Sequence, residues 1–329
     1  MTEHNFDIVS IGDTTQDVFI GIDDASVLCD IDKENCMLTL RYADKIPVTS
    51  VDDLIGGNAS NNAIGSRRLG LRSAIYTIVG DDAVGEAIEK TYDREGVGSN
   101  FIQVDTKRGS NYSAILNFRA ERTILVYHEK REYDLPDIGD PEWVYLTSVG
   151  EGHEGMHAQL LEKLTGTNIK LGFNPGTHQL KAGFDTLKPL IALTDAFFVN
   201  KEEAQLLVNN NQPLDVPELC KKLKETVRGV AVVTDGMNGS WAYDGEKMFH
   251  QDAHPLPPVE RTGAGDSYGT AFISALYHGK SFADALTWGS LNGASVVQYV
   301  GPHAGLLTKE QMETWHAAEP EFRPEEVTF

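Results

Sequence analysis

Cysteine is scarce in this chain, with three in 329 residues. Cys29, Cys36 and Cys220 are an odd number and lack the close pairs of a zinc ribbon. We therefore expect neither a disulfide framework nor a metal knuckle, and a reducing compartment is the simpler assignment.

Long apolar runs are also absent, and none is long enough to cross a bilayer. The first five residues are polar and lead directly into a strand-like segment, without the pattern of a signal peptide. The sequence therefore predicts a cytoplasmic protein with no membrane partner.

Basic residues are few. The 28 lysines and arginines face 49 aspartates and glutamates, which gives a formal net charge of −21. This field repels nucleic acid, so we expect no nucleic-acid partner. It repels nucleotides too, and an acidic enzyme that uses ATP needs local donors or a divalent cation at the phosphates. Composition leaves open whether the acidity reflects a saline habitat.

Strand-like apolar runs alternate with helical patterns, which predicts an α/β fold with a parallel sheet covered by helices on both faces. The predicted strands are 6–11, 74–79, 143–147, 169–173, 196–199 and 230–234. The predicted helices are 59–69, 84–95, 202–207, 217–227, 265–278 and 282–299. No linker or repeat interrupts the chain, so we expect one domain over residues 1–329.

Two segments break this alternation. Residues 21–50 form a long insertion, and residues 111–118 and 123–127 have the pattern of a β-hairpin. We predict that segments at about 21–50 and 108–130 form a small β lid over a ligand at the strand ends, where open α/β sheets bind. The alternative is a hairpin that extends the main sheet.

The most informative motif is the turn Gly263-Ala264-Gly265, which opens onto an apolar helix with Asp266 at its start. The first amides of a helix lack internal partners and lie at the positive end of its dipole, so they bind anions. A carboxylate beside an anion site is suited to accept a proton from an attacking hydroxyl, and phosphoryl transfer to an alcohol needs both parts. The alternative is a tight loop followed by an ordinary first-turn acid.

A second pattern, His153-Glu154-Gly155-Met156-His157, fits the H-E-x-x-H signature of zinc enzymes. That signature needs a regular helix, and the glycines in and before this segment are poor helix formers. No third ligand is obvious, so we expect a loop or a helix start here and not a zinc site.

Four ordered elements together resemble the ribokinase-like, or PfkB, family of carbohydrate kinases. They are Gly12 followed by Asp17 at the end of the first strand, the Gly-Gly segment 56–63, the Asn-x-x-Glu element 200–203 and the segment 260–266. The resemblance covers nearly the whole chain. It implies a three-layer αβα sandwich with a mostly parallel central sheet and a small β lid. Glu260 and Arg261 stand where the family commonly has Asp-Thr, which puts the family's monovalent-cation site in doubt.

The resemblance implies that Asp266 is the general base for the substrate hydroxyl, with the amides of residues 263–265 as the anion hole. It also implies that Glu203 organises Mg²⁺ through water, with Asn200 close to the nucleotide; a hard cation that keeps its water suits this role. From spacing alone, Asn200 and Glu203 instead predict a helix capping box.

For the acceptor, the resemblance implies a pocket made by Asp17, Gly57 and Asn61, with Asp13 and Asn58 beside them. A carboxylate binds sugar hydroxyls, glycine lets the ring approach, and an asparagine amide both donates and accepts. Asn58 stands where relatives that use phosphorylated sugars commonly carry lysine, which favours a non-phosphorylated sugar. Turns and helix caps are the alternative at all these positions.

For the nucleotide, the segment Thr234–Gly239 resembles the family's strand-end loop along ATP. The resemblance assigns Thr234 and Gly236 to that contact, with Gly239 in support. It also places Asn292 beside the adenine. The alternative for residues 234–239 is a β-hairpin turn, and both descriptions can hold together.

The sequence therefore predicts an ATP- and Mg²⁺-dependent kinase that transfers the γ-phosphoryl group to a hydroxyl of a small non-phosphorylated sugar. Two alternatives remain open: a nucleoside kinase of the same superfamily, and a non-catalytic sugar-binding regulatory protein. A lid of exposed strands can pair with a second copy of itself, so a homodimer through the lid is a further option.

Overall fold

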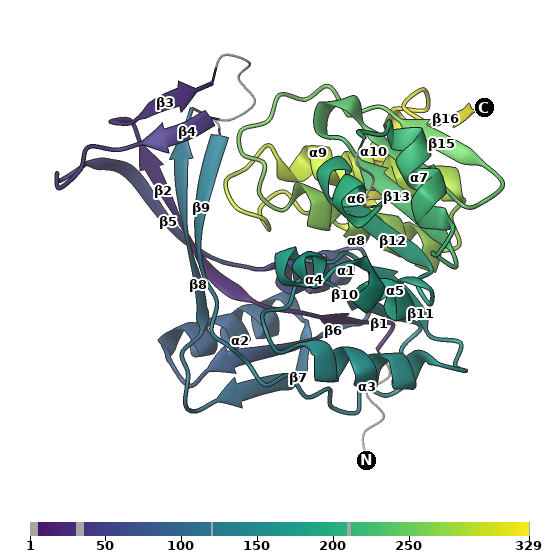
Figure 1. The fold of residues 1–329 in the computed structure, drawn as a ribbon, viewed down its shortest axis with the longest axis horizontal. Coiled ribbons are helices and arrows are strands. Elements are labelled where there is room, and N and C mark those ends of the chain that lie inside the picture. The colour runs from purple at the N-terminus through teal and green to yellow at the C-terminus, as the bar shows by residue number, and fades with distance from the viewer. Residues whose placement is uncertain (1–5, 31–35, 120, 209–211, 329) are drawn as a thin grey trace.

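The computed structural model describes residues 6–30, 36–119, 121–208 and 212–328. This part of the chain forms a three-layer α/β/α sandwich around a ten-stranded sheet (Figure 1). In spatial order the strands are β16 (Glu325–Val327), β15 (Met248–Gln251), β14 (Ser240–Tyr243), β13 (Val230–Thr234), β12 (Ala196–Asn200), β11 (Lys170–Phe173), β10 (Trp143–Leu146), β1 (Ile8–Ile11), β6 (Ser73–Gly80) and β7 (Gly98–Asp105).

The strands from β13 through β7 are all parallel, and β14, β15 and β16 continue the sheet in antiparallel order. Every residue of β1, β6 and β10 is buried. A parallel sheet covered on both faces needs such uninterrupted apolar strands. All six predicted strands lie in this sheet, so the predicted α/β class is confirmed.

One face of the sheet is covered by α1 (Asn58–Arg68), α2 (Ala83–Glu95), α8 (Ala264–Tyr277), α9 (Phe282–Val296) and α10 (Lys309–Ala318). The other face is covered by α3 (Glu154–Leu164), α4 (Thr177–Ala182), α5 (Phe184–Ile191), α6 (Lys201–Val208) and α7 (Val216–Lys224). Among the described residues, no helix combines the length and the apolar character that a membrane span requires.

A second sheet stands away from the sandwich (Figure 1). Its strands are β5 (Val48–Gly56), β2 (Thr15–Ile22), β8 (Asn111–Phe118) and β9 (Glu121–Tyr127), in that order. The β8–β9 hairpin is the predicted one, and it belongs to this separate sheet instead of extending the main one. We call these four strands the lid.

Two details of the lid differ from the sequence prediction. Asp17 lies within β2 and not at the end of the first strand, because the chain leaves β1 and enters the lid at Thr15. The segment 21–50 also projects beyond the lid, where β3 (Ser26–Cys29) and β4 (Cys36–Thr39) form a small antiparallel pair (Figure 1).

A disulfide joins Cys29 to Cys36 across this small pair of strands, so the expectation from the cysteine count was wrong here. The two residues are direct partners in the antiparallel register, a proximity that only the hairpin pairing creates. Cys220 is buried and free on α7. Cysteine usage therefore does not support the assignment to a reducing compartment.

Candidate active site

Two cavities meet beside the carboxyl ends of the parallel strands. The larger, which we call the lid cavity, has a volume of about 800 Å³ and lies between the β8–β9 hairpin and the starts of α1 and α8. The smaller, which we call the loop cavity, has a volume of about 200 Å³ and lies between the β13–β14 turn, residues 253–261 and α9. The β8–β9 hairpin lines the lid cavity, whereas none of the described residues of segment 21–50 contributes to its wall.

The start of α8 forms one wall of the lid cavity. Gly263, the residue before this helix, has a φ of 78°, and a Cβ there would lie 2.8 Å from the Cβ of Pro302. Because α8 begins at Ala264, its first amides have no partner inside the helix. Residues 263–266 all line the cavity, and amides at a helix start are of the kind that can bind an anion.

Asp266 lies in the first turn of α8 and is only 8% exposed. Asn61 donates from Nδ2 to Oδ2 of this carboxylate at 2.7 Å. Burial raises the pKa of Asp266 to about 6, and the negative charge of Asp17 acts in the same direction, while the Asn61 bond opposes them. The group is therefore mostly ionised at neutral pH and can accept a proton.

His303 completes this arrangement, and the sequence analysis missed it. Its Nε2 lies 2.9 Å from Oδ1 of Asn61. Burial lowers the pKa of His303 to about 4, so the ring is neutral and donates from Nε2 to Asn61. This bond fixes the orientation of the Asn61 amide, with Nδ2 toward Asp266. His303 lies in a loop, and its role comes from its contact with α1. No local sequence pattern could have identified it.

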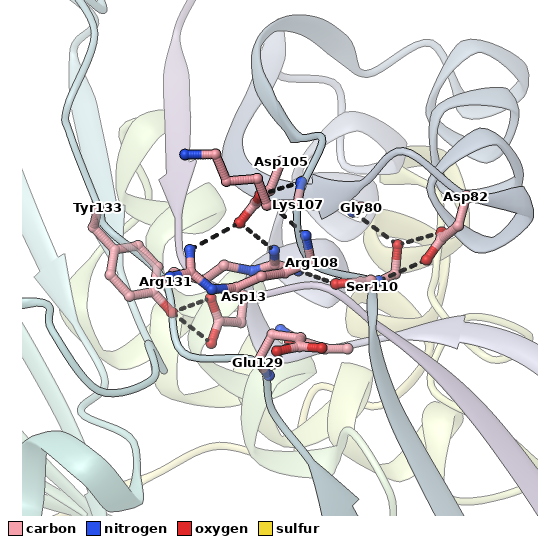
Figure 2. Close-up of polar contacts among 12 residues, drawn as sticks. Asp13, Gly80, Asp82, Asp105, Lys107, Arg108, Ser110, Glu129, Arg131 and Tyr133 are labelled. Carbon is pink, nitrogen blue, oxygen red and sulfur yellow. Dashed lines mark hydrogen bonds and ion pairs between the residues drawn. The ribbon is translucent and has the colours of Figure 1, made fainter.

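Two carboxylates from the start of the lid also face the cavity. Asp17 accepts a hydrogen bond from Oγ1 of Thr15 at 2.6 Å, and burial raises its pKa. Asp13 accepts from the hydroxyl of Tyr133 at 2.8 and 3.1 Å (Figure 2), and burial raises its pKa to about 6. Asp13 is therefore held by Tyr133, while Asp17 is held by the side chains of Thr15 and Ser113.

Three further residues that the sequence analysis assigned to the acceptor pocket line the same cavity. Asn58 and Asn61, at the start of α1, line the lid cavity together with Gly57. Gly57 has a φ of 92°, and a Cβ would lie 2.6 Å from the carbonyl oxygen of Asp13. Glycine is thus required here by the backbone of the β1–β2 turn.

Asn200 and Glu203 form the capping box that their spacing predicts. The amide of Asn200 donates to Oε2 of Glu203 at 2.9 Å, and the amide of Glu203 donates to Oδ1 of Asn200 at 2.8 Å. Both residues also line the lid cavity. Burial raises the pKa of Glu203, and a cation at the cavity wall would relieve that cost.

The base of the lid is held by a buried polar network (Figure 2). Arg131, whose side chain is fully buried, pairs with Asp105 at 3.0 Å and donates to the carbonyl of Gly109. Ser110 donates from its amide and its hydroxyl to Asp82 at 2.8 and 2.7 Å. These contacts fix both ends of the β8–β9 hairpin to the body.

We expect Arg131→Met to lower the free energy of unfolding by about 3 kcal/mol, because it removes a buried ion pair with Asp105 and leaves the carbonyl of Gly109 without its donor. Arg108→Met is the matched control. Its side chain is 36% exposed and pairs with the same Asp105 at 3.3 Å, so its cost should stay below about 1 kcal/mol. Urea denaturation measures both values, and equal losses would contradict a special role for Arg131.

The zinc-like histidines lie at a helix start, as expected. His153 caps α3, and its Nδ1 lies 2.8 Å from the carbonyl oxygen of Gly150. His157 contacts Nε2 of Gln179 at 3.1 Å. Within the described ranges, no three histidine, cysteine, aspartate or glutamate side chains are grouped to hold a metal ion.

The pfkB family carbohydrate kinase model matches residues 20–309 of this sequence. The chain belongs to the PfkB family. It is a carbohydrate kinase, a phosphotransferase with an alcohol group as acceptor.

Among curated relatives, the chain is 27% identical to the 5-dehydro-2-deoxygluconokinase of Bacillus subtilis over 290 residues, which covers 79% of this chain and 85% of the relative. Among solved structures, Arabidopsis thaliana ribokinase complexed with ribose and ATP has a TM-score of 0.75 and 18% identity, covering 94% of this chain and 98% of that one. Burkholderia thailandensis nucleoside kinase in complex with inosine has a TM-score of 0.76 and 18% identity, covering 96% and 100%. These likenesses establish the ribokinase-like fold. Structures of that fold include complexes with ATP and Mg²⁺.

In this PfkB kinase, Thr234, Gly236 and Gly239 line or border the loop cavity. They belong to the turn from β13 to β14, which contains the short 3₁₀ helix Gly236–Asn238, so the hairpin alternative also holds. Gly239 has a φ of 88°, and a Cβ would lie 2.1 Å from the carbonyl oxygen of Gln251.

Asn292 does not line either cavity, in contrast to the prediction that it lies beside the adenine. It is fully buried in α9. Its Nδ2 donates to the carbonyl of Ser267 at 2.9 Å, and its Oδ1 accepts from the amide of Leu307 at 3.1 Å. The amide therefore ties α9 to α8, and Gly293 and Ala294 supply the cavity wall instead.

Proposed function

We propose that this PfkB-family kinase transfers the γ-phosphoryl group of ATP to a hydroxyl of a small non-phosphorylated sugar. One observation carries the proposal. Asp266 and the first residues of α8 line the lid cavity, and residues 264 and 265 also line the loop cavity. A base and an anion site thus lie together where the two cavities meet.

In this proposal the acceptor hydroxyl lies in the lid cavity and gives its proton to Asp266. Asn61 already bonds Oδ2 of Asp266, which leaves Oδ1 for the hydroxyl. The amides of residues 263–265 donate to the transferring phosphoryl group, whose negative charge they stabilise. Catalysis then consists mainly of positioning and charge stabilisation, as phosphoryl transfer requires.

The donor set of the site fits Mg²⁺. This ion keeps several waters and binds through one or two carboxylates plus substrate phosphates. Glu203, beside the α8 start in the lid cavity, would hold it through water, and Asn200 would lie close to the phosphates. When bound, the ion neutralises charge on the phosphates, and a chain with a net charge of −21 needs that local compensation.

The loop cavity suits the base and ribose of ATP. Its wall includes apolar side chains such as Met237, Leu256 and Val297 and few polar ones. An aromatic base gains from burial against such a surface. We propose that Thr234, Gly236 and Gly239 contact the nucleotide at the β13–β14 turn.

We propose that Asp17, Gly57, Asn58 and Asn61 bind the sugar, with Asp13 as a buried support beside Asp17. Among the described residues, five cationic or imidazole side chains also line the lid cavity, and they are Arg122, His128, His178, Lys181 and Arg261. Lys181 is exposed and forms no ion pair with a described residue. These groups favour a sugar that carries a carboxylate, in line with the name of the Bacillus subtilis relative.

A coupled assay of ADP release with Mg²⁺ tests the function. The acceptors are D-ribose, D-fructose, D-gluconate, 2-deoxy-5-keto-D-gluconate, adenosine and inosine, with ATP alone as the control. Turnover of a sugar above both nucleosides supports the proposal. A preference for a nucleoside would replace it with the nucleoside-kinase alternative, and release at the ATP-alone rate with every acceptor would contradict it.

We further propose that residues 1–329 act as one kinase domain and that two copies pair through the lid. The lid exposes large apolar side chains on its edge and face, among them Val51, Leu125 and Tyr127 at 60%, 56% and 58% exposure. An exposed apolar patch of this kind marks an interaction surface.

Sedimentation velocity tests this pairing. The unchanged chain should sediment as a dimer, and Leu125→Asp as a monomer with unaltered thermal stability, because a carboxylate at this face cannot be buried without a partner. Leu206→Asp is the control, since Leu206 is equally exposed, at 58%, on α6. A monomeric unchanged chain, or a dimer in both variants, would contradict the lid interface.

A further inference from the structure

The loop cavity and the lid cavity share part of their walls. Among the described residues, five line both cavities, and they are Thr234, Arg261, Ala264, Gly265 and Tyr268. Four of these carry no charge at neutral pH. Arg261 is therefore the one formal charge on the shared wall, and it is a cation.

The guanidinium of Arg261 is available for a ligand. The side chain is exposed and forms no ion pair with a described residue. The adjacent carboxylate of Glu260 is turned to other groups. Its Oε1 accepts from the amide and the hydroxyl of Thr262 at 2.8 and 2.6 Å, and lies 3.6 Å from Nε of Arg122 in the lid.

The acidic side chains around the lid cavity give a cation on this wall a direct electrostatic effect on a bound anion. The lid cavity is lined by four acidic side chains, and they are Asp13, Asp17, Glu203 and Asp266. A phosphoryl group that crosses toward them carries negative charge of its own. The amides at the start of α8 supply only partial positive charge. A full cation beside those amides would offset the repulsion at the point of transfer.

We propose that Arg261 is a catalytic residue that donates from its guanidinium to the non-bridging oxygens of the transferring phosphoryl group. The inference rests on the proposed function. In the step itself, a bond forms between the acceptor oxygen and the γ-phosphorus, and the bond from that phosphorus to the β–γ bridging oxygen breaks. The electron pair stays on the nucleoside diphosphate, the hydroxyl proton goes to Asp266, and Arg261 remains protonated throughout.

Arginine is suited to this task for a geometric reason. Its planar fork of donors binds two phosphate oxygens at once, while a lysine ammonium acts as a point charge. The position precedes Gly263, the residue before α8, by two residues, so its backbone lies close to the start of that helix. The long side chain can then follow the phosphoryl group from the loop cavity to the lid cavity.

Steady-state kinetics of Arg261→Ala and Arg261→Lys test the proposal, with ATP, Mg²⁺ and the best acceptor from the screen. We expect Arg261→Ala to lower kcat by about 10³-fold, the lower end of the range for a catalytic arginine, with little change in KM for ATP. Arg261→Lys should retain more activity than Arg261→Ala, and added guanidinium ion should restore part of the rate of Arg261→Ala. The control Arg323→Ala, at a 70% exposed arginine far along the chain, should match the unchanged enzyme.

A binding measurement gives a readout that needs no acceptor. The unchanged protein should bind MgADP with aluminium fluoride more tightly than MgADP alone, because the fluoride complex imitates the transferring group. Arg261→Ala should lose this difference while it keeps its affinity for MgADP.

Three outcomes would overturn the role of Arg261. They are a kcat close to that of the unchanged enzyme, a loss confined to KM for ATP, and an undiminished gain from aluminium fluoride in Arg261→Ala. The proposed function fails separately, through an unchanged enzyme that releases no ADP with any acceptor in the screen. An active enzyme that is indifferent to Arg261 therefore removes this inference alone.

Discussion

Asp266→Asn is expected to fold, to bind ATP and to lose at least about 10²–10⁴-fold in kcat, the range for removal of a general base. An asparagine at this position still accepts the bond from Nδ2 of Asn61, because its amide oxygen can replace Oδ2. It cannot take a proton from a hydroxyl. The measurements are kcat in the coupled assay, the melting temperature and the affinity for ATP.

The control for this variant is Asp13→Asn. Asp13 is buried beside the same cavity and has a pKa raised to about 6, but Tyr133 holds both of its oxygens. We expect this change to affect KM for the acceptor more than kcat. Near-normal turnover of Asp266→Asn would remove the mechanism, whatever the acceptor.

The pH dependence follows from the same carboxylate. The proposed base acts only when ionised, and its pKa is raised to about 6, so kcat/KM should fall about tenfold per pH unit below about pH 6. Because the pKa of Asp266 is raised, activity should be lost at a higher pH than if the base were an exposed aspartate. In Asp13→Asn the fall of kcat/KM at low pH should persist. If it disappeared in that variant, the titrating group would be Asp13 instead of Asp266.

The strands of the sandwich could be predicted because the sequence of each strand alone indicates that it is buried. Strands buried on both faces must be continuously apolar, as β10 and β13 are. β2 and β5 of the lid were not predicted, because β2 alternates buried and half-buried residues, while β5 is almost entirely exposed and carries Asp52 and Asp53. Such strands acquire their order from long-range pairing: β2 pairs with β5 on one side and with β8 on the other, and both partners are distant in sequence.

The residues of the candidate site also differ in whether their place depends on local sequence or on long-range contacts. Residues set by a local turn, such as Gly57, Gly263 and Asp266, all line the lid cavity. His303 was missed because its role exists only through its contact with Asn61. Asn292 was placed wrongly because two long-range hydrogen bonds, invisible in the sequence, use its amide inside the body.

The second large effect is expected from Gly263→Ala, compared with Gly265→Ala. A Cβ at Gly263 would lie 2.8 Å from Cβ of Pro302, and the φ of 78° is one that alanine adopts only with strain. The turn must therefore shift, and the amides of the anion site shift with it. Removing one such donor costs roughly 10²–10³-fold in kcat, so we expect a loss of this size.

Gly265 offers a matched comparison two residues away. A Cβ there meets no atom within 4 Å, and the residue lies inside α8, where alanine is favoured over glycine. If the glycines serve only to let the backbone turn, Gly265→Ala should keep kcat close to that of the unchanged enzyme. If the bound phosphoryl group itself approaches the backbone at Gly265, the added methyl group should raise KM for ATP. Equal losses of kcat in both variants, with unchanged thermal stability, would show that the geometry of the Gly263 turn is not what holds the anion site in place.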